Sequence, residues 1–211
     1  MAEMTLPGAA TRFRYGILDD NPIYRQLLGM CPTLAVTASL AGAFTMAAAT
    51  TFVLIMASTV VCLLRHQLKG HLRILVFTMA IATFVTIVDR FLAAYVFSMS
   101  RQLGPYIPLI IVNCIIICRC EVCASHQPIH VAISDAAGQG VGFLLGLTSI
   151  AAVRELLATG GFFLNEANPA AGVRVIPGWP NWTVMAGPAG AFITLGVLMG
   201  VVNLISKRKK S

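Results

Sequence analysis

The chain has 211 residues, of which 57% are hydrophobic and only 11% are charged, and its mean hydropathy is +0.82. A soluble domain of this size needs about a quarter of its residues charged, so the composition excludes a soluble protein and indicates an integral membrane protein. Membrane topology explains the net charge of +7 better than nucleic-acid binding does, because the basic residues 207–210 directly follow the last apolar run.

The apolar runs are long and show no strand alternation, so we expect transmembrane helices rather than a β-barrel. We expect residues 1–21 to form a cytoplasmic segment without a cleavable signal peptide, because they contain no continuous apolar stretch. Residues 26–64 carry no charge. At about 20 residues per span, this length predicts two helices, at about 22–40 and 43–64, with a tight turn at 40–43.

Four further spans are predicted, at about 74–97, 104–123, 136–157 and 182–205. The side of the membrane that holds both termini receives most of the basic residues, namely Arg12, Arg14, Arg25, Arg65, Lys69, Arg73, Arg119, Lys207, Arg208, Lys209 and Lys210. The opposite side receives Arg101, Arg154 and Arg174, and Arg90 lies inside the third span. Because cytoplasmic loops are enriched in Lys and Arg, both termini are predicted to be cytoplasmic.

The first and fourth spans share a pattern. Each begins at a proline that is followed nine residues later by a cysteine, Pro22 and Cys31 in one case and Pro105 and Cys114 in the other. Nine helical residues rise about 13 Å, which brings both thiols near the middle of a bilayer about 30 Å thick if the prolines lie at its surface. Pro32, directly after Cys31, is expected to break the first helix just past the thiol.

Because each half contains three spans, the second half enters the membrane upside down relative to the first, as in inverted-repeat membrane proteins. We therefore expect an all-α integral membrane protein with six transmembrane helices, of which helices 1 and 4 are interrupted. The two inverted three-helix repeats are residues 22–97 and 98–206, and residues 207–211 form a basic cytoplasmic tail.

The paired cysteines are the best candidates for a functional site. A lone membrane cysteine such as Cys62 is explained by packing, but two thiols at matched positions favour a metal or iron–sulfur site, because thiolates are soft ligands. An iron–sulfur cluster usually takes four protein ligands, so a partner subunit or a second copy would supply the other two. A disulfide between the two thiols is also possible but has no evident purpose.

Two other functions are compatible with the same sequence. A secondary transporter would need polar groups within the membrane, and Asp89 and Asn113 are the candidates for such an ion pathway. Asp89 and its neighbour Arg90 lie near the end of the third span, where snorkelling to the interface explains them equally well. A structural scaffold whose cysteines only pack is the third alternative.

Two long motifs carry a family resemblance. Residues 20–37, DNPIYRQLLGMCPTLAVT, and residues 108–121, PLIIVNCIIICRCE, resemble the two signatures of the RnfE/NqrD family of membrane subunits of the Rnf and Nqr electron-transport complexes. LRI at 72–74, VRELL at 153–157 and PAGAFITLG at 188–196 extend the resemblance over nearly the whole chain beyond residue 15. The first motif and the PAGAFITLG segment are more similar to RnfE than to NqrD, and an NqrD-type subunit is the alternative.

The resemblance implies a subunit of a translocase in the bacterial inner membrane, without a complete active site of its own and without nucleotide or flavin. Such a subunit pairs with a homologous, inverted, RnfA-like subunit and with the other Rnf subunits. Each of the two would give two cysteines, here Cys31 and Cys114, to one intramembrane [2Fe–2S] cluster. Electron transfer between ferredoxin and NAD⁺ would be coupled to movement of Na⁺ or H⁺.

One segment departs from the family pattern. Cys118, Cys120 and Cys123 stand where the family has small residues, in the pattern G-R-A-E-A-x-A. A metal site with the nearby His126 and His130 is conceivable. On a helix, however, the three thiols do not share one face, so replacement of one small residue by another is the favoured interpretation.

Overall fold

The computed structural model describes residues 13, 16, 20–65, 72–95, 97–162, 173–174 and 183–208. Four helical segments are long and apolar enough to cross a membrane: Leu40–Leu64 (α3), Arg73–Tyr95 (α4), Ile107–Ala124 and Ile129–Thr159 (α7). The expected all-helical membrane protein is confirmed at this level. Within the described residues, strand structure is confined to one antiparallel pair, β1 (Gly161–Phe162) and β2 (Val173–Arg174).

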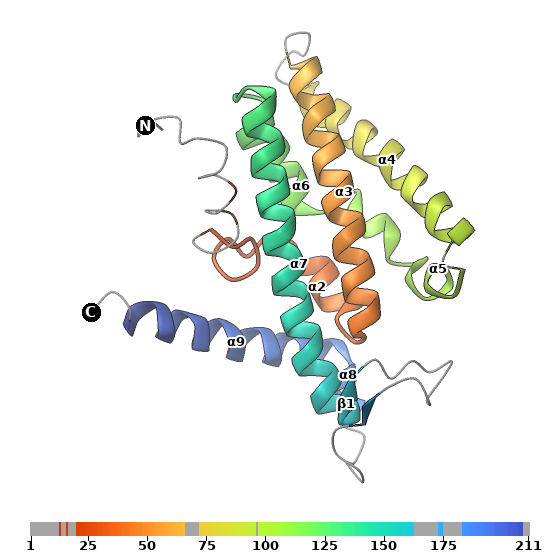
Figure 1. Ribbon diagram of the computed structural model, residues 1–211, viewed down its shortest axis with the longest axis vertical. Helices are drawn as coiled ribbons and strands as arrows, with labels where there is room; N and C mark the ends of the chain where they lie inside the picture. Colours follow the sequence, from red (N-terminus) through yellow and green to blue (C-terminus); the bar gives the residue numbers. More distant parts are fainter. Residues whose placement is uncertain are drawn as a thin grey trace.

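The long helices α3 and α7 lie side by side at the centre of the molecule and make its most extensive helix–helix contact (Figure 1). They are antiparallel. Leu40, at the start of α3, donates its N–H to Oε2 of Glu155 near the end of α7 (2.7 Å), and Cys62, near the end of α3, contacts the carbonyl of Gln127 just before α7 (3.4 Å). The helices approach closely at Gly140 of α7, where a Cβ atom would collide with the side chain of Thr51 of α3.

The ends of these helices explain where the sequence-based boundaries were wrong. Ser39 caps α3 by accepting the N–H of Gly42 (3.3 Å), so the turn lies at residues 37–39 rather than at 40–43. Helix α7 ends where Gly160 adopts a left-handed φ of 70°. It begins at Ile129, earlier than the predicted 136, so Asp135 is helical and does not lie in the loop that the sequence suggested.

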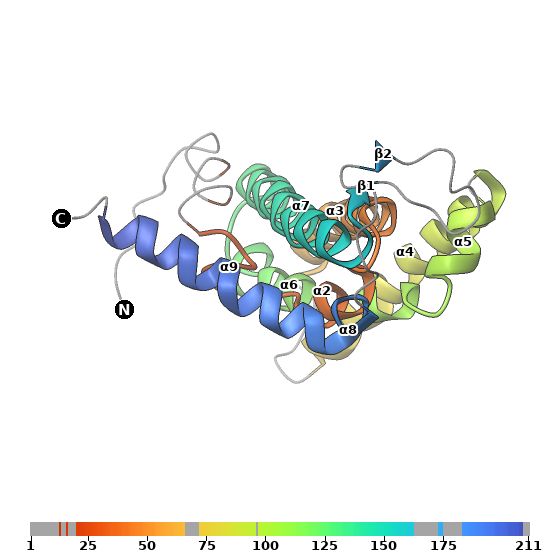
Figure 2. The ribbon, with the colours of Figure 1, turned by 90° about the horizontal axis from the view of Figure 1, so that it is seen from below.

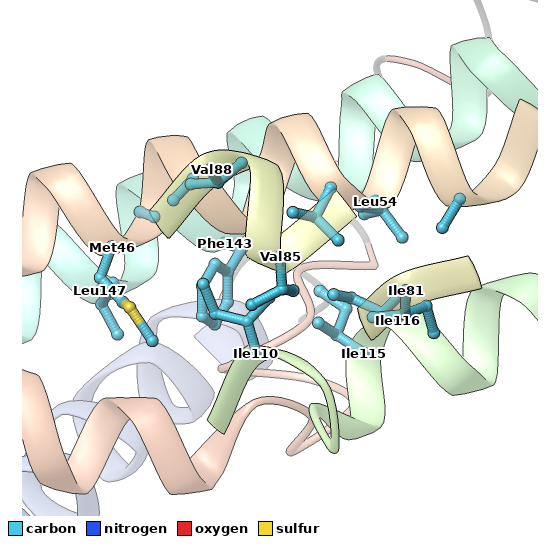
Figure 3. Packing of buried hydrophobic residues seen from close by; sticks show 14 of the residues in the cluster. Met46, Leu54, Ile81, Val85, Val88, Ile110, Ile115, Ile116, Phe143 and Leu147 are labelled. Carbon is cyan, nitrogen blue, oxygen red and sulfur yellow. The ribbon is translucent and has the colours of Figure 1, made fainter. Parts of the chain in front are cut away.

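The hydrophobic core joins both halves of the chain. Helix α4 packs on α3 and fills the predicted third span almost as expected, at 73–95 against 74–97. Figure 3 shows side chains from α3, α4, α7 and the segment 107–124 meeting in one cluster that includes Leu54, Ile81, Val85, Ile110, Ile115 and Phe143. The opposite face of α4 exposes Ile74, Leu75, Met79, Ile87, Phe91 and Tyr95, an apolar surface suited to lipid.

The first predicted span is not a continuous helix. Residues 22–26 form turns, Leu27 and Gly29 have positive φ values of 57° and 76°, and only Met30–Val36 (α2) is helical. The expectation that Pro32 breaks the helix was wrong. Pro32 lies in the first turn of α2, where its missing N–H costs no hydrogen bond. The irregular segment therefore precedes Cys31, and α2 starts at Met30.

The fourth predicted span is interrupted as well. A short helix, α5 (Phe97–Leu103), leads into a 3₁₀ turn, η1 (Ile107–Ile110). Helix α6 (Cys114–Arg119) then starts at the second thiol and continues into a π-helical turn, η2 (Cys120–Ala124). The interruptions expected in helices 1 and 4 are therefore both present.

The last predicted span, 182–205, consists of α8 (Thr183–Ala186) and α9 (Pro188–Arg208). Figures 1 and 2 show α9 running across the α3–α7 pair instead of along it, and its apolar part covers only Pro188–Leu204. Most of the N-terminal segment, most of the loop 159–181 and the end of the basic tail lie outside the described residues.

Candidate functional site

Cys31 and Cys114 occupy equivalent places in two short helices. Cys31 is the second residue of α2, behind the N-cap residue Gly29, and Cys114 is the first residue of α6, behind the N-cap residue Asn113. Both helices directly follow an irregular segment. Both thiols are free and exposed, so both are accessible to a ligand or to another chain.

A direct contact brings the two thiol segments together. The backbone N–H of Gly29 donates to Sγ of Cys114 over 2.9 Å, although the two residues are 85 positions apart. A side chain at Gly29 would collide with Phe143, because a Cβ atom there would lie 2.5 Å from Cε2 of that ring. Hydrogen bonds to sulfur ligands stabilise their negative charge and tune the redox potential of a cluster.

The contact with Phe143 also places the site along α7. Phe143 is the fifteenth of the 31 residues of α7, so Gly29 lies beside the middle of this long helix. The depth estimate of about 13 Å from nine helical residues does not hold, because residues 22–29 fold into turns in which the N–H of Leu28 binds the carbonyl of Pro22 (2.8 Å). The offset from Pro22 therefore does not fix the depth of Cys31.

The residues present fit one half of a metal centre. Two exposed thiols are suitable soft ligands, yet nowhere in the described part of the chain do three or more His, Cys, Asp or Glu side chains gather around a possible metal ion. Leu27 and Val112, four residues before Cys31 and two before Cys114, are exposed at 46% and 65%. The arrangement fits a cluster whose remaining ligands come from another chain.

The other cysteines have different surroundings. Cys62, Cys120 and Cys123 are buried, and Cys118 is half-buried. The conceivable metal site formed with His126 and His130 is not assembled in the residues that the structure describes. Burial among apolar side chains agrees with the interpretation that these thiols replace small packing residues.

A buried ion-pair network holds the far end of α6. Arg119, the last residue of α6, lies 3.2 Å from Oδ2 of Asp20 and 3.7 Å from Oδ2 of Asp135 on α7. Gln139 on α7 donates to the carbonyl of Asp20 (3.4 Å). The sequence placed Arg119 near the end of the predicted fourth span and counted it with the basic residues of the cytoplasmic side, and the structure adds that its side chain is only 10% exposed and is paired.

A second buried network lies at the other end of α7. Arg154 and Glu155, expected to end the fifth span, are 1% and 3% exposed and lie inside the helix. Arg154 donates to the hydroxyl of Thr37 and to the carbonyls of Met185 and Gly187. Charged residues within an apolar run tend to be functional, and this signal in VRELL, residues 153–157, would have identified the network.

The two candidates for an ion pathway are not joined. Asp89 lies half-buried on α4 beside the exposed Arg90. Asn113 is 1% exposed, and its Oδ1 accepts the N–H of Ile115 (3.3 Å) as the cap of α6. No hydrogen bond or ion pair connects Asp89 with Asn113 within the described residues, so capping explains Asn113 without an ion pathway.

Comparisons with known proteins show the family of this chain. The family model described as "Rnf-Nqr subunit, membrane protein" matches residues 9–199. The chain belongs to the Rnf-Nqr family. It is 42% identical to the E subunit of the Na⁺-translocating ferredoxin:NAD⁺ oxidoreductase complex of Acetobacterium woodii, over 92% of this chain and 95% of that protein. It is 38% and 40% identical to the E subunits of the ion-translocating oxidoreductase complexes of Pasteurella multocida and Methanosarcina acetivorans, over 95% and 94% of this chain and 92% of each relative.

The family resemblance predicted from the sequence is thus confirmed. In this Rnf-Nqr subunit, the two motifs at 20–37 and 108–121 form the two irregular segments with their short thiol-bearing helices. The matching motif at 153–157 supplies the buried Arg154 and Glu155.

Proposed function

We propose that this chain is the E-type membrane subunit of an Rnf-type, ion-translocating ferredoxin:NAD⁺ oxidoreductase complex. Cys31 and Cys114 supply two of the four protein ligands of an intramembrane [2Fe–2S] cluster. The observation that carries this proposal is the pair of exposed thiols at the starts of two adjacent short helices, linked by the N–H of Gly29 on the sulfur of Cys114. The E-type relatives, similar over nearly their whole length, support it.

The proposed partner for the other two ligands is a homologous, RnfA-like subunit of inverted orientation. Leu27 and Val112, exposed four and two residues before the thiols in sequence, are apolar residues that such a partner would cover. A site shared between two chains explains why the thiols are accessible while most of the other cysteines are buried. The remaining Rnf subunits and the bilayer complete the environment.

The proposed architecture is six spans in two inverted repeats, residues 22–97 and 98–206. Each half contains a short thiol-bearing helix, α2 or α6, then a long helix, α3 or α7, then a further helix, α4 or α9. The antiparallel packing of α3 against α7 supports the inversion, because equivalent helices of inverted repeats run in opposite directions. In the assembled complex in the bacterial inner membrane, α9 completes the sixth span and both termini are cytoplasmic.

When bound, the cluster would supply a one-electron carrier inside the membrane. The chain itself contributes two thiolates, one N–H donor on a ligand sulfur, and apolar side chains around them that exclude water. Electron transfer is coupled to transport of Na⁺ or H⁺ by the complex as a whole. This subunit holds no complete active site.

The test is the iron and acid-labile sulfide content of the purified complex. Cys31→Ser and Cys114→Ser each remove one thiolate ligand of the cluster. Each variant complex is therefore expected to lose about two irons and the matching acid-labile sulfide. Cys62→Ser is the matched control, because this buried thiol contacts the carbonyl of Gln127 far from the site. Full iron content in both ligand variants would remove the basis for the proposed cluster.

A further inference from the structure

Helix α2, which carries Cys31, is held at its far end by a buried arginine. Thr37, the C-cap residue of α2, accepts a hydrogen bond from Nη1 of Arg154, while its own hydroxyl donates to the carbonyl of Thr33 one turn earlier. Thr37 is fully buried and Arg154 is 1% exposed. The guanidinium thus binds the end of the helix opposite to the thiol.

The same guanidinium binds a second element. Its Nη2 atom lies 3.2 Å from the carbonyl of Met185 and 2.9 Å from that of Gly187, at the junction between α8 and α9. The neighbouring Glu155 accepts the N–H of Leu40 at the start of α3 (2.7 Å). The C-terminal end of α7 therefore fixes the end of α2, the start of α3 and the α8–α9 junction together.

We propose that Arg154 is a positioning residue for Cys31. Helix α2 has only seven residues, and helices this short have little stability of their own, so outside contacts set its direction. Arg154 fixes that direction and links it to the α8–α9 junction. The proposal rests on the proposed function, in which Cys31 is a cluster ligand.

The other thiol helix has a corresponding anchor. Arg119 ends α6 and pairs with Asp135 near the start of α7. Each thiol helix is thus held at its far end by a buried arginine. Near its start α7 provides Asp135, which pairs with Arg119 of α6, and near its end it provides Arg154 itself, which binds Thr37. Because α7 is a single helix of 31 residues, it sets the relative positions of both anchors.

The decisive variant is Thr37→Val. Valine keeps the shape of threonine but cannot accept the hydrogen bond from Arg154, and the carbonyl contacts of Arg154 at the α8–α9 junction stay intact. Thr50→Val is the matched control. Thr50 is also buried, at 1% exposure, and also donates to a carbonyl one turn earlier, that of Met46 (2.8 Å). Within the described residues no arginine donates to Thr50.

Hydrogen–deuterium exchange of the purified complex measures how firmly α2 is held, and it requires no cluster. In Thr37→Val, the amides of α2 are expected to exchange about tenfold faster, the change that a loss of ~1.4 kcal/mol in local stability produces. The amides of α6 keep their wild-type exchange in this variant, and both thiol helices keep it in Thr50→Val. Electron paramagnetic resonance of the reduced complex is expected to show shifted g-values and a shifted midpoint potential in Thr37→Val only.

Unchanged exchange of the α2 amides in Thr37→Val overturns the proposal. Faster exchange with an unaltered resonance signal and midpoint potential also overturns it, because the hydrogen bond would then hold α2 without positioning Cys31. Arg154→Lys is a second variant. A lysine cannot span the hydroxyl and both carbonyls as the planar guanidinium does, so the same direction of change is expected. If the wild-type complex contains no cluster, the proposed function fails, and the exchange data alone decide whether Arg154 holds α2.

Discussion

Gly29 is the residue on which the contact between the two thiol segments depends. Its φ of 76° lies in the left-handed region, and its N–H faces the sulfur of Cys114 at 2.9 Å. The ring of Phe143 fills the space where a side chain would be. Both the backbone conformation and the close packing thus require glycine.

Gly29→Ala is expected to destabilise the protein by at least ~1–2 kcal/mol, the cost of a left-handed conformation for a residue with a Cβ atom, and the collision with Phe143 adds to this. The displaced N–H also weakens the contact with Cys114. Thermal unfolding and iron content of the purified complex measure the two effects.

Gly196→Ala is the control for that substitution. Gly196 is exposed on α9, and a Cβ atom there would meet nothing within 4 Å. Alanine favours helix over glycine by up to ~1 kcal/mol, so the stability of this variant is expected to stay equal or rise. Equal stability of the Gly29 and Gly196 variants would contradict the role assigned to Gly29.

At the scale of the helices, ion pairs of different burial hold the segment 107–124 in place. Arg119 is 10% exposed and faces Asp20 and Asp135, whose side chains are 35% and 4% exposed. Arg73 pairs with Glu121 over 3.0 Å near the surface, with side chains 24% and 43% exposed. Removing one partner of a buried pair leaves a charge without compensation, whereas an exposed charge is solvated by water.

Arg119→Met is therefore expected to lower the stability of the complex by ~3–5 kcal/mol, while Arg73→Met lowers it by less than ~1 kcal/mol. Denaturant titrations of both variants provide the comparison. Adding Asp135→Leu to Arg119→Met removes the buried carboxylate and is expected to restore part of the loss. Similar losses in the two single variants would show that Arg119 does not anchor α6.

At the scale of the whole molecule, the orientation of α9 distinguishes the isolated chain from the proposed assembly. In this chain α9 crosses the α3–α7 pair, and its outer face exposes Phe192, Ile193, Val197, Val201 and Leu204. An apolar face of this length is suited to lipid or to a partner helix. The basic residues 207–210 at its C-terminal end favour a cytoplasmic C-terminus.

Reporter fusions test this topology in cells. Green fluorescent protein fused after Ser211 is expected to fluoresce, and alkaline phosphatase at the same place is expected to be inactive, because both termini are proposed to be cytoplasmic. A fusion after Thr159, at the end of α7, is expected to give the opposite pair of signals. Phosphatase activity at the C-terminus would exclude a six-span topology with both ends inside.

The sequence by itself determined the membrane class, the position of α4, the interruptions near both thiols and the family. These features are local, because length and hydropathy along the chain specify the membrane class and α4, and short motifs around the two cysteines specify the interruptions and the family. The spacing of the two prolines and cysteines also identified the right pair of thiols as candidates, although the helix between Pro22 and Cys31 that justified their depth does not exist.

Only the tertiary structure decided which residues meet. The contact of Gly29 with Cys114 and the buried contacts of Arg119 and Arg154, which the sequence placed near the ends of predicted spans, join residues far apart in the chain. The start of α2 at Met30 was not predicted from the sequence either. The physical reason is that the local sequence around a charged residue in or beside an apolar run is the same whether its side chain reaches water or binds a buried partner. Packing of residues separated by 85 or more positions chooses between these outcomes, and no local periodicity encodes it.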